Sequence, residues 1–110
     1  MTTTEELAAS LNECLPIDGL VRAEVCGLGM LWLCNEWNAK FCVSEEAVIG
    51  YLWRECVRRG WYVELSLSTV KVSTVVNGRF DMHFQVAGTS ALSFARAFAA
   101  AKKAAEGGAK

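Results

Sequence analysis

The residues best suited to chemistry in this sequence are one histidine and five cysteines. His83 stands two residues after Asp81 in an alternating stretch, so both side chains are expected on one strand face, about 6–7 Å apart. Ser73 or Lys71 would be cross-strand neighbours, and a serine or cysteine beside a base is the arrangement used in nucleophilic catalysis. An ordinary solvated strand face is the alternative interpretation, and it is the one that we favour.

The cysteines do not have the spacing of a metal site. Zinc sites use closely paired Cys or His ligands, whereas Cys26, Cys34 and Cys42 follow one another at intervals of eight residues. A hairpin could bring Cys34 and Cys42 together, but the odd cysteine count and the absence of a signal-peptide pattern predict reduced thiols in a cytoplasm. The Gly27-Leu28-Gly29 segment lacks the third glycine and the lysine of a phosphate loop, so we expect no cofactor.

The composition excludes some partners and favours others. The 110 residues carry 11 basic and 12 acidic side chains, so no strong field favours nucleic acid or an anionic membrane. The longest nearly apolar run, residues 25–34, is too short to span a bilayer. The chain is 53% hydrophobic with four tryptophans, which predicts an aromatic-rich core or apolar surface covered by a partner, including a second copy. Trp32, Trp37 and Trp53 are the tryptophans to consider for such contacts, and Trp37 lies in a polar loop context.

A strand is predicted at residues 80–86, where polar and apolar side chains alternate. Its apolar members are expected to share one buried face: Phe80, Met82, Phe84 and Val86. A three-residue loop at Asn77-Gly78 is favoured, because it pairs Val72 with Met82 and therefore sets apolar against apolar. The opposite, polar face would carry Lys71, Ser73, Asp81, His83 and Gln85.

Further strands are predicted before this one. Residues 61–67 alternate cleanly, and a two-residue turn at Ser68-Thr69 would place Leu67 opposite Val70. In the N-terminal half, two or three short strands are expected between residues 20 and 43.

Three helices complete the set of elements. Residues 3–6 (TTEE) have the spacing of a capping box, and Pro16 ends the first helix. Ser44 is expected to cap the second helix and Gly60 to end it. Residues 91–105 are nearly all good helix formers and predict a third helix that packs on a sheet. The charged side chains of this last helix are expected to face solvent: Arg96, Lys102 and Lys103.

Together these elements predict an α+β fold of order α–β(2–3)–α–β3–α, in which one antiparallel-rich sheet carries the packed helices. Residues 1–106 are expected to form a single layered domain, and residues 107–110 a frayed tail. The order helix, three strands, helix is also that of a double-stranded-RNA-binding domain. That module needs lysines at the start of its last helix, where this chain reads Thr89-Ser90-Ala91-Leu92.

Two segments resemble small phage and prophage proteins of the phage ABA-sandwich family. They are Glu45–Leu65 (EEAVIGYLWRECVRRGWYVEL) and Ala87–Ala101 (AGTSALSFARAFAAA). The second is similar to the family's last turn and helix in these residues: Thr89, Leu92, Arg96 and Ala97. The family's proline before the leucine is replaced here by Ala91. The resemblance implies a helix–sheet–helix layered fold and a phage origin, and it implies no catalytic motif.

The leading hypothesis is a small non-enzymatic protein that binds a bacterial host or defence protein in the host cytoplasm. It would act as an anti-CRISPR-like inhibitor by masking its partner's surface. The candidate contact residues are Trp32, Trp37, Glu64, Asp81 and His83. The alternatives are a nucleic-acid-binding module of helix–three strands–helix order and a small enzyme centred on His83.

Overall fold

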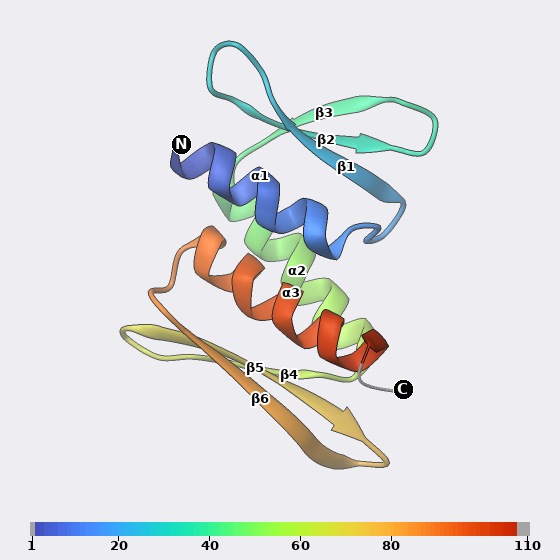
Figure 1. The fold of residues 1–110 in the computed structure, drawn as a ribbon, viewed down its shortest axis with the longest axis vertical. Coiled ribbons are helices and arrows are strands. Elements are labelled where there is room, and N and C mark those ends of the chain that lie inside the picture. Colours follow the sequence, from blue (N-terminus) through green and yellow to red (C-terminus); the bar gives the residue numbers. More distant parts are fainter. Residues whose placement is uncertain (1, 108–110) are drawn as a thin grey trace.

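The computed structural model describes residues 2–107, which form an α+β fold (Figure 1). The helices are α1 (Thr3–Cys14), α2 (Glu45–Arg59) and α3 (Ala91–Gly107). The strands are β1 (Leu20–Val25), β2 (Leu31–Asn35), β3 (Lys40–Val43), β4 (Tyr62–Leu65), β5 (Thr69–Val76) and β6 (Arg79–Ala87). The predicted class and element order are confirmed, with three strands between α1 and α2. Helix α3 includes Gly107, the first residue of the predicted tail, while residues 108–110 lie outside the described part of the chain.

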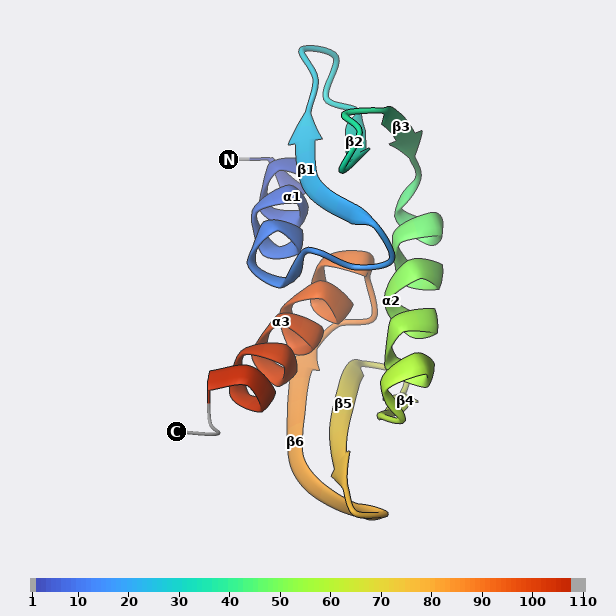
Figure 2. The ribbon, with the colours of Figure 1, turned by 90° about the vertical axis from the view of Figure 1, so that its right-hand side faces the viewer.

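Two three-stranded antiparallel sheets enclose the helices, as Figures 1 and 2 show. Sheet A has the order β1-β2-β3, and sheet B has the order β4-β5-β6. The expectation of one sheet is therefore wrong, and the helix–sheet–helix order implied by the resemblance is reversed. Helix α1 packs on β1 and α3, and α3 packs on β5 and β6, so the helices form the middle layer. No helix within residues 2–107 is long and apolar enough to cross a membrane.

Helix α3 lies at the centre of the core because its many alanines allow α1, α2 and sheet B to approach closely. Phe94 and Phe98 are fully buried, as their spacing predicts. The prediction that the Lys102 side chain faces solvent is wrong. Lys102 is buried, and its Nζ donates a hydrogen bond to the carbonyl oxygen of Cys14 at 2.6 Å. Cys14 ends α1, and the last carbonyls of a helix have no partner within it, so the ammonium group satisfies one of them.

The helix ends follow the local signals in the sequence. In α1 the capping box is one residue earlier than predicted: Thr2 Oγ1 accepts from the Glu5 N–H at 3.1 Å, and the Glu5 carboxylate accepts from the Thr2 N–H at 3.0 Å. In α2 the predicted caps are confirmed. Ser44 Oγ accepts from the N–H of Ala47, and Gly60 adopts the left-handed conformation with φ 75°.

The β4–β5 turn has its tip at Leu67 and Ser68, so the predicted pairing of Leu67 with Val70 is wrong. Val70 pairs with Leu65 instead. The hydroxyl of Ser66 accepts the Thr69 N–H at 3.0 Å, which closes the turn one position earlier than alternation suggests. Leu67 is left fully exposed at the tip.

The β5–β6 turn contains two residues rather than the predicted three. Asn77 and Gly78 both adopt left-handed conformations, with φ of 53° and 76°, as the mirror-image hairpin turn requires. Val72 pairs with Phe84, not with the predicted Met82. The predicted and the observed register both set apolar side chains opposite one another. The hairpin has the additional residue that the prediction assigned to the loop, but this residue lies in a β-bulge within β6.

Candidate functional site

The bulge in β6 changes which side chains share the outer face of sheet B, the face turned away from the helices. Asp81 and Met82 together lie opposite Thr74, so the alternation of β6 changes phase there. The Met82 N–H donates to Thr74 Oγ1 at 3.1 Å, which pairs a backbone group within the bulge. The predicted common face of Phe80 and Met82 is therefore wrong, because Phe80 lies on the outer face beside His83.

Three aromatic side chains meet on this outer face: Tyr62, Phe80 and His83. We call them the aromatic cluster. The ring centroid of Phe80 lies 5.6 Å from that of Tyr62 and 5.6 Å from that of His83, in tilted arrangements that favour ring contacts. The folded chain leaves Tyr62 52% and Phe80 59% exposed, and His83 is exposed as well. Sheet B thus carries apolar surface that its own domain does not cover.

His83 and Ser73 are brought together, but not in a catalytic arrangement. Ser73 Oγ and His83 Nδ1 share a hydrogen bond of 2.6 Å. Ser73 is only 1% exposed, so a substrate cannot reach its oxygen as nucleophilic catalysis requires. Asp81 was expected beside His83, but it lines a hollow of about 340 Å³ with Trp61 and Ala104. The hydrogen bond between Ser73 and His83 therefore orients the imidazole within the aromatic cluster.

Polar side chains border the aromatic cluster. Glu64, a predicted contact residue, pairs across the strands with Lys71, with 3.2 Å between Oε1 and Nζ. With Gln85 they line a hollow of about 320 Å³. An ion pair this exposed contributes little to stability, so both groups can exchange it for contacts with a partner. One acid and one base side by side provide no net field for a phosphate backbone.

Trp37 lies at the tip of the β2–β3 turn, on the opposite side of the helical layer from sheet B (Figure 1). The side-chain oxygen of Asn35 accepts from the backbone N–H groups of Trp37 at 3.0 Å and Ala39 at 2.9 Å. These bonds fix the turn and leave Trp37 82% exposed. Trp37 and the aromatic cluster therefore belong to two different surfaces.

Trp32 is only partly exposed on the outer face of sheet A. With Glu24, Cys26 and Lys40 it lines a hollow of about 220 Å³. Its indole nitrogen is buried and pairs with no nitrogen or oxygen of residues 2–107. The indole N–H, together with backbone N–H groups of the β1–β2 turn, instead lowers the pKa of the Cys26 thiol because these donors stabilise the thiolate. Trp32 is therefore less accessible to a partner than Trp37.

The cysteines are free thiols spread over the fold. Across β2 and β3, Cys34 pairs with Lys40 and Cys42 pairs with Trp32, so the two cysteines do not face each other. Within residues 2–107 no group of three or more His, Cys, Asp or Glu is arranged to hold a metal ion. Burial raises the pKa of the Cys56 thiol to about 12, which makes it unreactive near neutral pH.

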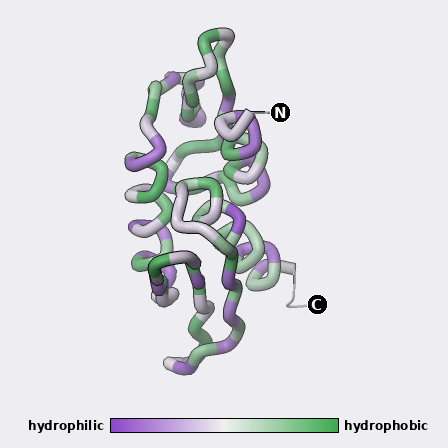
Figure 3. The backbone as a smooth tube through the Cα atoms, turned by 90° about the vertical axis from the view of Figure 1, so that its left-hand side faces the viewer, coloured by the Kyte–Doolittle hydropathy of each residue, from purple (hydrophilic) through white to green (hydrophobic). Residues whose placement is uncertain are grey.

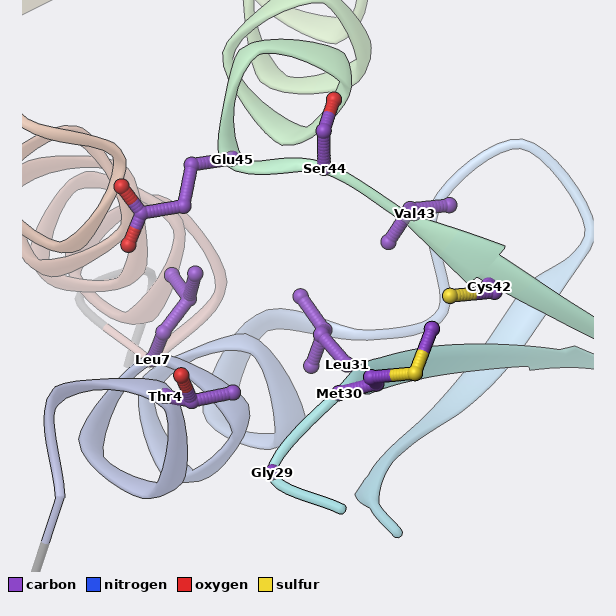
Figure 4. Close-up of a pocket in the computed structure, with 9 residues that line it drawn as sticks. All are labelled: Thr4, Leu7, Gly29, Met30, Leu31, Cys42, Val43, Ser44 and Glu45. Carbon is purple, nitrogen blue, oxygen red and sulfur yellow. The ribbon is translucent and has the colours of Figure 1, made fainter.

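A larger hollow opens between sheet A and the first turns of α1 and α2 (Figure 4). Its volume of about 450 Å³ lies within the range of ligand pockets. We call it the sheet A hollow, and its lining residues are Thr4, Leu7, Gly29, Met30, Leu31, Cys42, Val43, Ser44 and Glu45. The β1–β2 turn beside it, at the top of Figure 3, carries hydrophobic positions at the surface, among them Leu28 and Met30. No sequence pattern predicted this hollow, because its lining comes from separate segments of the chain.

No protein-family model, curated protein or solved structure matches this chain. The resemblance to the phage ABA-sandwich family stays a prediction. The support for a function of this chain therefore comes from the geometry of its exposed surfaces: the aromatic cluster on sheet B, and Trp37 on the opposite side of the helical layer.

Proposed function

We propose that this protein is a non-enzymatic binding protein that docks the outer face of sheet B onto another protein. The observation that carries this function is the exposed aromatic cluster of Tyr62, Phe80 and His83. Aromatic residues dominate the energetic hot spots of protein interfaces, and an apolar centre with a polar rim is their usual anatomy. The rim in this case is the Glu64–Lys71 pair with Gln85.

The size of the exposed cluster is consistent with a hot spot. Aromatic side chains bury about 150–250 Å² each, so the exposed fractions of Tyr62 and Phe80 amount to roughly 200 Å². At about 25 cal/mol per Å², covering that area yields roughly 5 kcal/mol before the costs of association. A standard interface covers about 800 Å² on each partner, so the rim must be part of the contact.

The proposed partner is a protein of a bacterial host or of its defence system, whose surface the cluster would mask in the host cytoplasm. The resemblance of Glu45–Leu65 and Ala87–Ala101 to phage proteins supports this form of the proposal. Nucleic acid is less favoured, although bases also stack on exposed aromatic rings. Binding of a nucleic-acid strand needs a positively charged groove, whereas the carboxylate of Glu64 neutralises the charge of Lys71 beside the aromatic cluster.

The test is affinity capture from bacterial lysate with three tagged baits: the unaltered chain, Phe80→Ala and Val57→Ser. Val57 is 65% exposed on α2 and belongs to neither surface, so Val57→Ser is the matched control. A stoichiometric protein retained by the unaltered chain and the control, but lost with Phe80→Ala, is expected. Equal retention by Phe80→Ala, or no protein with any bait, contradicts the proposal. Capture that nuclease abolishes would move the function to nucleic acid.

A further inference from the structure

We propose that two copies of this chain associate through the free edge of β3, with Trp37 of each copy seated at the sheet A hollow of the other. The order β1-β2-β3 makes β3 an edge strand, and three of its four residues, Lys40, Phe41 and Cys42, are exposed. Unpaired backbone N–H and C=O groups of an edge strand are a template for pairing with another chain. This interface lies on sheet A, so it is separate from the binding surface proposed for sheet B.

Two-fold symmetry explains why a second copy fits this edge. When a strand pairs with its own copy in antiparallel orientation, the start of one strand lies beside the end of the other. In β3 the start follows the turn that displays Trp37, and the end at Val43 forms a wall of the sheet A hollow. Antiparallel pairing therefore brings the indole of each copy to the hollow of its partner.

Matching of apolar side chains selects the register of this pairing. Phe41 and Val43 lie on the inner face of sheet A, where they pair with Leu33 and Leu31 of β2. A register that sets Phe41 opposite Val43 of the second copy continues this apolar face across the dimer. The same register places Cys42 on the two-fold axis, opposite Cys42 of the second copy.

Charge and area both support a second copy as the occupant. Lys40 begins β3, whereas Glu45 and Glu46 follow its end, so antiparallel pairing brings basic and acidic side chains together twice. Trp37 is 82% and Phe41 is 48% exposed, which offers roughly 300 Å² per copy. With the matching area on each partner, the dimer would bury roughly 1,200 Å², the lower end of stable interfaces.

The first test is the oligomeric state of the full chain as a function of concentration, measured by analytical ultracentrifugation. A monomer–dimer equilibrium is expected, and Trp37→Ala should raise its dissociation constant at least about 30-fold, as loss of an interface hot spot does. Leu67→Ser removes a fully exposed apolar side chain from the tip of sheet B and should leave the constant unchanged. A chain that stays monomeric at 100 μM (roughly the range of weak dimers), or a dimer unaffected by Trp37→Ala, overturns the inference.

The second test locates the two-fold axis by cross-linking. Copper-catalysed oxidation by O₂ removes two electrons and two protons from a pair of thiols and joins them as a disulfide, with O₂ as the acceptor. Cys42 is exposed, and the proposed register places it close enough to its copy for this bond. We expect a covalent dimer that Cys42→Ser abolishes and a reducing agent reverses. A non-covalent dimer that forms no such cross-link, or one whose cross-link survives Cys42→Ser, overturns pairing through β3.

Discussion

Replacing Lys102 with methionine would remove an ammonium group that ties α3 to the end of α1. Lys102 Nζ donates to the carbonyl oxygen of Cys14 at 2.6 Å, and Lys102 is 7% exposed. Methionine preserves most of the aliphatic stem, so the variant removes the polar contact while it retains packing. A hydrogen bond to a charged group contributes about 1.5–3 kcal/mol, and the buried carbonyl would lose its partner. The cost of burying the ammonium group in the folded state reduces the net contribution of this hydrogen bond. We therefore expect Lys102→Met to lower the free energy of unfolding by about 2 kcal/mol, within the range for hydrogen bonds to charged groups.

Urea unfolding followed by tryptophan fluorescence measures this change. With a slope of about 2 kcal/mol per M, the midpoint should fall by about 1 M. Lys103→Met is the matched control, because Lys103 is the exposed neighbour on the same helix and its loss should change stability by less than about 0.5 kcal/mol. If Lys102→Met unfolds at the same urea concentration as Lys103→Met, the burial cost offsets the hydrogen bond. The hydrogen bond between Lys102 and Cys14 would then contribute no net stability, and the contact between α1 and α3 would depend on packing alone.

Three further predictions test other parts of the fold. Iodoacetamide should alkylate Cys26 far faster than Cys56 in the folded chain at pH 8. Hydrogen-bond donors lower the pKa of the Cys26 thiol, whereas burial raises the pKa of the Cys56 thiol to about 12. Similar alkylation rates of the two cysteines, measured by peptide mapping, would contradict this prediction. Burial raises the pKa of the Glu55 carboxyl, but hydrogen bonds from Arg58 and Arg59 outweigh burial and lower this pKa from its ordinary value of 4.5. Its stabilisation is therefore present above pH 4.5 and lost as the pH falls below that value, so Glu55→Gln should flatten the acid-side decline of Tm; an unchanged slope would show that Glu55 is not its source. Gly88→Ala should lower the free energy of unfolding in urea by roughly 1–3 kcal/mol, because the φ of Gly88 is +91° and the new Cβ would lie 2.6 Å from Ser93 Oγ. In the control Gly27→Ala the new Cβ meets no atom within 4 Å, so this variant should lose less stability.

The second helix was predictable because its signals are local. Ser44 bonds to a backbone N–H three residues later, and Gly60 adopts a conformation that favours glycine over any other residue. Such contacts form within one turn of chain and need no knowledge of the rest of the fold. The same reasoning predicted the α+β class, since class depends on the order of elements rather than on their arrangement in space.

The number of sheets was not predictable, because it depends on contacts between residues far apart in the sequence. Alternation in β1–β3 and in β4–β6 specifies one buried face for each strand, but not whether the two sets share hydrogen bonds. The burial of Lys102 escaped prediction for a related reason. A lysine in the last turns of a helix ordinarily points into solvent, and only the approach of α1, which ends 88 residues earlier in the chain, supplies a carbonyl oxygen there.

The aromatic cluster escaped prediction because two sound rules conflict in the β5–β6 hairpin. Asn77-Gly78 favours a two-residue turn, whereas matching of apolar faces, applied to unbroken strands, favours a three-residue loop. The chain satisfies both by placing the extra residue in a bulge opposite Thr74, whose hydroxyl pairs the Met82 N–H. The bulge sets Phe84, instead of the predicted Met82, opposite Val72, and it places Phe80 on the outer face beside His83. Conflict between a turn preference and strand alternation is therefore itself a signal that a sequence can provide: it indicates a bulge, and a bulge is where an apolar side chain can leave the core and become available to a partner.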